Sequence, residues 1–240
     1  MNFNETLFRS SAIGDLMSDP KTKADKDAGL LSKTAQSYLI EVYISQKYGR
    51  DKDVQTKQMK KGIEVEQDSI DMLSKYLNKT LYKNEKRFTN DWIGGTPDIV
   101  LEDSIIDVKS SYDLWTLLGK IPNKLDSLYH WQMQSYMWLT GTKQAKVCYC
   151  LIDTPDSIIE TEKYYLLKKM DVISEDSPDF VRECLKLEHS MKFGDIPMNE
   201  RILVFNVDRN EDDILKIQHK VEKAREFLFE LEKTHLNFNN

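Results

Sequence analysis

Cysteine is scarce in this chain, and long apolar runs are missing. The 240 residues include only three cysteines, Cys148, Cys150 and Cys184, which form no CxxC pair and are too few for a disulfide framework. No stretch is long enough in apolar residues to span a bilayer, and the N-terminus carries no apolar leader. We therefore expect a soluble protein of a reducing compartment, the cytoplasm, without a membrane partner.

An excess of positive charge is also missing. The chain has 34 Lys and Arg against 40 Asp and Glu, a net charge of −6. It is no general polycation, so any nucleic-acid surface has to be a local basic groove. The length suits one α/β domain with elaborations, or at most two small domains. Because no repeat, low-complexity tract or linker divides it, we expect a single domain over residues 1–240.

The most informative stretch is a predicted β-hairpin. The apolar runs 95–101 and 105–110 flank the turn-like residues 102–104. Side chains alternate between the two faces of a strand, so Asp107 and Lys109 point to the same space. The sequence thus predicts a carboxylate and an ammonium group side by side on one strand.

Asp98 opens the neighbouring strand and would bring a second carboxylate to that space. Two acidic side chains beside a lysine form a hard-cation site with a group that handles protons or stabilises charge. The alternative is a hairpin edge whose charges face water. That reading is the commoner one for an isolated D-x-K, but these charges lie within apolar strands.

A long helix is expected from about Val54 to Leu77, with one continuous stripe of side chains. Glu66 is the only carboxylate in that stripe. It either faces a cation or strong donors, because burying an unpaired carboxylate is costly, or it lies at the margin and reaches water. The stripe consists of Met59, Ile63, Glu66, Ile70, Leu73 and Leu77.

A helix from about Lys124 to Thr140 places Gln132 and Tyr136 on one face. A buried amide needs partners. Gln132 is therefore either a core glutamine bonded to the backbone or a group that orients a water, the lysine or a phosphate. The other expected elements are a short N-terminal helix at 8–17 capped by Ser10 or Ser11, a loop at 19–29, helices at 32–48, 178–192 and 212–233, and strands at 81–88, 144–152 and 202–207.

Three separated blocks resemble one family. They are Lys61–Glu66, with its basic-Gly-x-x-x-Glu pattern; Gly95–Asp98 with Ile106–Lys109; and Tyr129–Tyr136, which is similar to the Q-x-x-x-Y element of RecB-like nucleases. Their order and spacing resemble the YqaJ/lambda-exonuclease branch of the PD-(D/E)XK nuclease superfamily. The resemblance covers roughly residues 8–152 and leaves 153–240 as an elaboration of helices and a strand.

The resemblance implies a restriction-endonuclease-like α/β core, with a mixed central sheet flanked by helices. It implies a deoxyribonuclease dependent on Mg²⁺, or Mn²⁺, that acts on the ends of double-stranded DNA. The implied metal ligands are Asp98, Asp107, the Val108 carbonyl and Glu66; the other implied catalytic residues are Lys109, Gln132 and Tyr136; and the implied DNA contacts are Arg9, Ser11 and Ser110.

The chain also departs from the family pattern. Asp107 replaces a more frequent glutamate, and no arginine clearly matches a 5′-phosphate pocket. Three cysteines exclude the iron–sulfur branch, so no such cluster is expected. Two alternatives remain open: a structure- or site-specific endonuclease, and a non-cleaving module that binds DNA ends. The resemblance further implies 5′-to-3′ action in phage-type recombination and repair, a ring-shaped homotrimer, a single-strand annealing partner and the host-cell cytoplasm.

Overall fold

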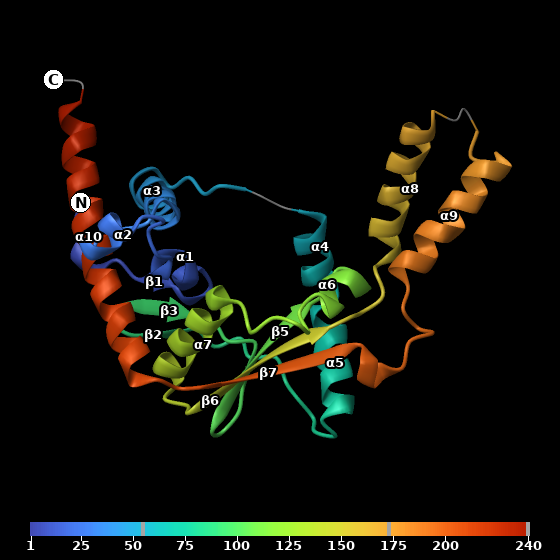
Figure 1. Ribbon diagram of the computed structural model, residues 1–240, viewed down its shortest axis with the longest axis horizontal. Helices are drawn as coiled ribbons and strands as arrows, with labels where there is room; N and C mark the ends of the chain where they lie inside the picture. The colour runs from blue at the N-terminus through green and yellow to red at the C-terminus, as the bar shows by residue number, and fades with distance from the viewer. Residues whose placement is uncertain (54–55, 172–173, 239–240) are drawn as a thin grey trace.

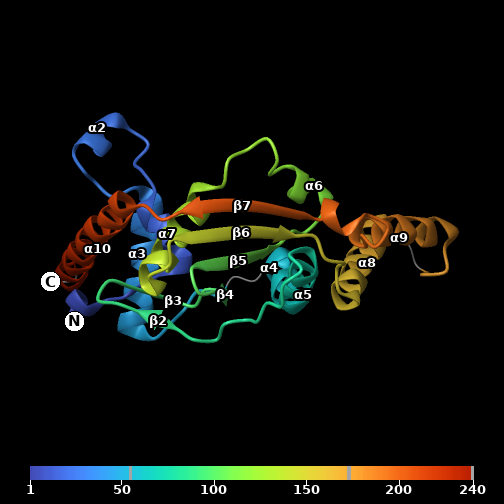
Figure 2. The ribbon, with the colours of Figure 1, turned by 90° about the horizontal axis from the view of Figure 1, so that it is seen from below.

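The computed structural model describes residues 1–53, 56–171 and 174–238. Its centre is a mixed sheet in the order β4-β5-β6-β7, in which β5 and β6 are parallel and the outer pairs are antiparallel (Figures 1 and 2). A smaller sheet has the order β1-β3-β2. The strands are β1 (Phe8–Arg9), β2 (Phe88–Thr89), β3 (Ile93–Gly95), β4 (Ile99–Val100), β5 (Ser104–Ser110), β6 (Gln144–Cys150) and β7 (Ile202–Asp208).

Helices lie on both faces of the central sheet and at its two ends (Figure 2). In the described part of the chain, no helix is both long and apolar enough to cross a membrane. The α-helices are α1 (Ile13–Met17), α2 (Lys23–Asp27), α3 (Lys33–Tyr48), α4 (Lys57–Glu64), α5 (Glu66–Tyr76), α6 (Leu114–Leu118), α7 (Ser127–Thr140), α8 (Asp156–Met170), α9 (Pro178–Met191) and α10 (Glu211–Asn237). Short 3-10 helices are η1 (Phe3–Glu5), η2 (Ser10–Ala12) and η3 (Met198–Glu200).

The predicted hairpin is confirmed, with Ile99 paired to Ile106 across β4 and β5. Alternation along β5 divides the core between two layers. Ile106 packs with the α5 side chains Ile70 and Leu73, whereas Ile105 packs with apolar side chains of α7. The odd-numbered positions of β5 therefore face α7, and this is the face that carries Asp107 and Lys109.

The N-terminal elements form a second packing centre with α10. Phe8, Leu16 and Leu39 are fully buried against the α10 side chains Val221 and Leu228. Helix α10 thus covers the N-terminal elements. At the opposite end, α8 and α9 form a pair that projects away from the sheet (Figure 1).

Helices at 32–48 and near 124–140 are confirmed with their caps. Ser32 accepts a hydrogen bond from the Ala35 N–H, and Gly49 and Gly141 end their helices in the left-handed conformation. The N-terminal helix was predicted too long, and its serine cap is wrong. Residues 8–17 instead form β1, η2 and α1, and Ala12, which offers no side-chain cap, precedes α1.

Four further differences concern the helices and strands. The long helix is two helices, α4 and α5, because Val65 leaves the helical conformation at φ −103° and ψ 15°; its expected start, Val54, lies outside the described residues. Of the predicted strand at 81–88, only Phe88 pairs in a sheet, as the first residue of β2. The predicted loop at 19–29 contains helix α2. Helices α6 and α8 were not predicted.

Candidate active site

The pair predicted on one strand face is present. Lys109 Nζ lies 2.8 Å from Asp107 Oδ2. The Asp107 carboxylate is almost entirely inaccessible, at 1% exposure, whereas about a quarter of the Lys109 side chain reaches solvent. Lys109 also lies over the ring of Tyr129, 5.0 Å from its centroid. Lys109 thus contacts the buried Asp107 carboxylate and is itself partly exposed to solvent.

Asp98 immediately precedes β4 and turns toward β5. Its Oδ2 accepts a hydrogen bond from the Val108 N–H at 2.7 Å. Strand β4 is so short that, within the described residues, Val108 has no partner strand on this side. Because the amide and carbonyl of a strand residue point to the same side, the Val108 carbonyl also faces Asp98. Two carboxylates and one carbonyl oxygen therefore gather along one edge of β5.

Helix α7 supplies the amide predicted to need partners. Gln132 Nε2 donates to Asp107 Oδ1 at 3.2 Å and lies 3.3 Å from the Tyr136 hydroxyl oxygen. Both α7 side chains are buried, at 5% and 4% exposure. A Cβ atom on Gly95 would lie 2.6 Å from the Tyr136 ring and 2.8 Å from Ser10 Oγ, so only glycine lets β3 approach this closely.

Glu66 begins α5, directly after the break at Val65. Its carboxylate is partly exposed and pairs with Lys83 Nζ at 2.5 Å. This partner was missed, because Lys83 lies in an irregular segment with no periodic pattern. The N-terminal part of the predicted stripe is also exposed, with Met59 at 51% and Ile63 at 69% exposure.

A cavity of about 470 Å³ brings most of these groups together. Its walls include Glu66, Asp98, Val108, Lys109 and Ser110, whereas the buried Asp107 does not line it and is paired with the lining Lys109. The cavity does not include Arg9 or Ser11, which are exposed on the N-terminal elements. Four other lining residues were not identified from the sequence as site residues: Gln58, Thr116, Lys120 and Tyr149.

The electrostatics of the two aspartates disfavour a second negative charge. Burial, together with the neighbouring Asp107 carboxylate, raises the pKa of Asp98 to about 7. Burial also raises the pKa of Asp107, against the opposing effect of Lys109. For Lys109, burial is outweighed by the two carboxylates, so its pKa is raised and its ammonium form is favoured.

The donor set fits a hard divalent cation. Asp107 Oδ2 and Ser111 Oγ are buried and make no well-angled hydrogen bond within the described structure, and Asp98 and Asp107 repel each other. A cation would satisfy the Asp107 oxygen and remove the repulsion between the two carboxylates. Among the described residues no three His, Cys, Asp or Glu side chains converge to hold a metal, so the set that fits is the two aspartates and the Val108 carbonyl.

The sequence matches no protein-family model and no curated protein. Solved structures do match. The fold superposes with a phage-related exonuclease from Haemophilus somnus 129PT at a TM-score of 0.75, with 26% identity over 98% of both chains. It also superposes with the alkaline exonuclease LHK-Exo of Laribacter hongkongensis at a TM-score of 0.63, with 15% identity over 98% of this chain and 94% of that one. The same protein in complex with dAMP gives a TM-score of 0.62 at 16% identity.

The mixed sheet and the Asp98, Asp107 and Lys109 cluster at its hairpin define a PD-(D/E)XK nuclease fold. Within that superfamily, the likeness to a phage-related exonuclease along the whole chain supports the YqaJ/lambda-exonuclease family.

Proposed function

We propose that this protein is a metal-dependent DNA exonuclease that hydrolyses phosphodiester bonds from the ends of double-stranded DNA, in the 5′-to-3′ direction. The observation that carries the proposal is the buried Asp107, which contacts both Lys109 and Gln132, together with Asp98 and Lys109 in the wall of an open cavity. The similarity to two exonucleases, one of which has been seen with dAMP, supports a DNA substrate.

Asp98, Asp107 and the Val108 carbonyl would hold Mg²⁺, or Mn²⁺, with Glu66 contributing from the same cavity. Bound there, the ion would neutralise phosphate charge and act as a Lewis acid. Glu66 would first have to share or release Lys83, to which it is now paired.

Lys109 would position the attacking water and stabilise charge on the phosphate through its ammonium group. A role as general base would require its pKa to fall, which the two carboxylates oppose as long as their charge is not neutralised. Gln132 would fix Asp107, and Tyr136 would hold the Gln132 amide in place. Ser110 lines the cavity where a phosphate oxygen would bind, and Arg9 and Ser11 would contact DNA farther away.

The wider role proposed is phage-type recombination and repair in the cytoplasm, with a single-strand annealing protein as partner. Assembly into a homotrimeric ring would let a net charge of −6 coexist with a basic interior. Analytical ultracentrifugation tests the trimer directly, since a monomer at working concentrations contradicts it.

The test of activity compares a linear duplex with a covalently closed circle, with and without Mg²⁺, using the wild type and Lys109→Ala. The proposal predicts loss of the linear DNA alone, dependent on metal and on Lys109. Cutting of the circle would indicate an endonuclease. Binding without cutting would indicate an accessory module.

A further inference from the structure

A second cavity lies on another side of α7 from the active site. It has a volume of about 880 Å³ and is enclosed by α1, α2, the first turns of α7, and α10. Leu128 and Trp131 of α7 line it, whereas Tyr129, which follows Leu128 in the same helix, lines the active-site cavity. Gly14 permits α1 to approach α7 closely, because a Cβ atom there would lie 2.7 Å from the Leu128 Cα.

The cavity concentrates positive charge in an acidic protein. Among the described residues, its lining contains four lysines and one carboxylate, Asp19; the lysines are Lys26, Lys216, Lys220 and Lys223. Lys26 pairs with Asp19 at 2.6 Å, and Lys223 donates to the Gly29 carbonyl at 3.0 Å. Lys216 pairs with Asp213 at 2.7 Å.

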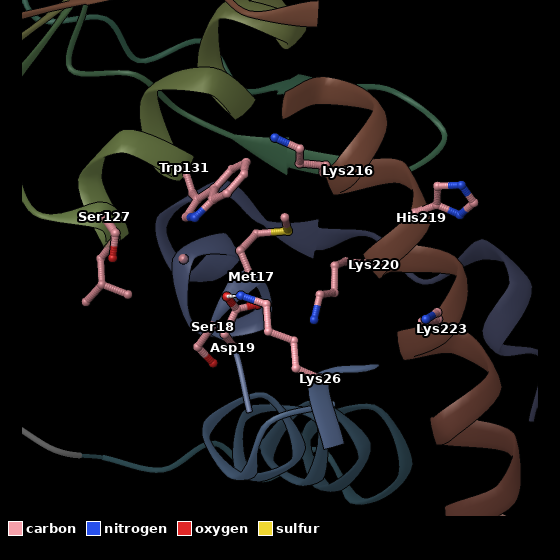
Figure 3. Close-up of a pocket in the computed structure, with 12 residues that line it drawn as sticks. Met17, Ser18, Asp19, Lys26, Ser127, Trp131, Lys216, His219, Lys220 and Lys223 are labelled. Atoms are coloured by element: carbon pink, nitrogen blue, oxygen red, sulfur yellow. Dashed lines mark hydrogen bonds and ion pairs between the residues drawn. The ribbon is translucent and has the colours of Figure 1, made fainter. Parts of the chain in front are cut away.

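Lys220 differs from these three lysines because it has no polar partner within the described residues. It is half-buried and makes no hydrogen bond or ion pair within the described residues. Figure 3 shows Lys220 reaching into the cavity from α10 and Lys26 reaching toward Asp19 from below, while His219 points away. Burial lowers the pKa of Lys220, and the charges of Lys223 and Lys26 lower it further against the opposing effect of Asp19. An anion in the cavity would relieve this repulsion.

An aromatic ring completes the arrangement. The Trp131 indole forms one wall of the cavity beside Met17, opposite the α10 lysines (Figure 3). Aromatic faces beside lysines are how proteins bind single-stranded nucleic acid, with bases on the rings and phosphates on the cations. A base within a duplex is already stacked and paired, so this combination favours a single strand.

We propose that this cavity, defined by Trp131, Lys26, Lys220 and Lys223, is a binding site for single-stranded DNA, with a base against Trp131 and a phosphate at Lys220. This goes beyond the proposed nuclease activity. It gives the protein a site that holds an unpaired strand next to the helix that carries Gln132.

The test is binding of a fluorescein-labelled 12-nucleotide oligothymidylate in EDTA, measured by anisotropy across a salt series. Because no metal is present, the result is independent of whether the protein cleaves DNA. Lys220→Ala should weaken binding about tenfold and reduce the slope of log affinity against log salt by about 0.7. Lys220→Arg should retain the affinity. Lys233→Ala is the matched control, because Lys233 is exposed on the same helix away from the cavity.

Two further arms identify the ligand. Trp131→Leu should lower the affinity for the single strand about tenfold, whereas Trp131→Phe should largely preserve it. The affinity for a 12-base-pair duplex should depend little on Trp131. Free dTMP and inorganic phosphate should compete only at far higher concentrations than the strand. The proposal is overturned if Lys220→Ala binds the oligonucleotide as tightly as Lys233→Ala does. It is also overturned if Trp131→Leu weakens binding of the duplex as much as binding of the single strand, or if dTMP competes as well as an unlabelled single strand.

Discussion

Gln132 Nε2 lies 3.2 Å from Asp107 Oδ1, while Lys109 approaches the other oxygen of the same carboxylate at 2.8 Å. A buried carboxylate with a hydrogen bond at one oxygen and an ion pair at the other is held in orientation, which a metal ligand requires. Helix α7 thereby sets the geometry of a residue on β5.

We expect Gln132→Ala to lower metal-dependent DNA hydrolysis by about 10- to 100-fold, because Asp107 loses the donor that orients it. The Mg²⁺ concentration for half-maximal rate should rise as well. Rates measured over a Mg²⁺ titration check both effects. Gln67→Ala, which removes an exposed amide paired with Asp71, is the control. Wild-type rates and metal dependence for Gln132→Ala would contradict a positioning role.

The hairpin and its charged face were predictable because a strand has a period of two and the Asp107 and Lys109 side chains follow it without interruption. The partners of those side chains were only partly predictable. Gln132 was identified as a buried amide on a helical face, but only packing of α7 against β5 shows that it bonds to Asp107.

Two other features could not be read from local patterns. The spacing of three and four along residues 57–76 continues through Val65, so nothing in the stripe indicated the break that exposes Ile63. The basic cavity beside Trp131 forms only where α1, α2, α7 and α10 meet, and no single segment contains its charge pattern.

The raised pKa of Asp98, about 7 against an ordinary 3.8, predicts that the metal-free protein loses stability as pH rises between these values. In this window the folded state keeps a proton that the unfolded state has released, so unfolding becomes easier as the pH increases. The total loss is at most about 4 kcal/mol. Asp98→Asn removes the titrating group and should be more stable than the wild type at pH 8 in EDTA.

Urea unfolding at pH 5 and pH 8 in EDTA measures this difference. Asp103→Asn, in the exposed hairpin turn, is the control. Mg²⁺ at pH 8 should stabilise the wild type more than Asp98→Asn. An unchanged pH dependence in Asp98→Asn would show that Asp98 is not the group responsible.

Lys61 is fully buried in α4, where its Nζ donates to the Tyr112 carbonyl at 2.8 Å and lies 5.0 Å from the Phe193 ring centroid. Burial lowers the pKa of Lys61 to about 8. The folded state then releases a proton between pH 8 and 10.5 that the unfolded state keeps, so wild-type stability should increase with pH in that window by at most about 3 kcal/mol.

Lys61→Met should abolish this increase, whereas Lys60→Met, at the exposed neighbouring position, should preserve it. Unfolding free energies from urea titrations at pH 8 and pH 9.5 give the comparison. If the unfolding free energies of both variants change with pH as those of the wild type do, burial of the Lys61 ammonium does not destabilise the folded state.

Gly95→Ala should damage both stability and activity. The added Cβ would lie 2.6 Å from Tyr136 Cε1 and 2.8 Å from both Cβ and Oγ of Ser10, and neither neighbour is the free end of a flexible chain. Overpacking of this kind costs about 1–3 kcal/mol. Relief by movement of Tyr136 would disturb the hydroxyl beside Gln132 and hence Asp107. Gly194→Ala is the matched control, because a Cβ there meets nothing within 4 Å. Thermal unfolding and DNA hydrolysis rates of both variants test this prediction. If Gly95→Ala matches Gly194→Ala in stability and in rate, β3 can move away from α7 without loss of stability, and the position of Tyr136 does not depend on this close approach.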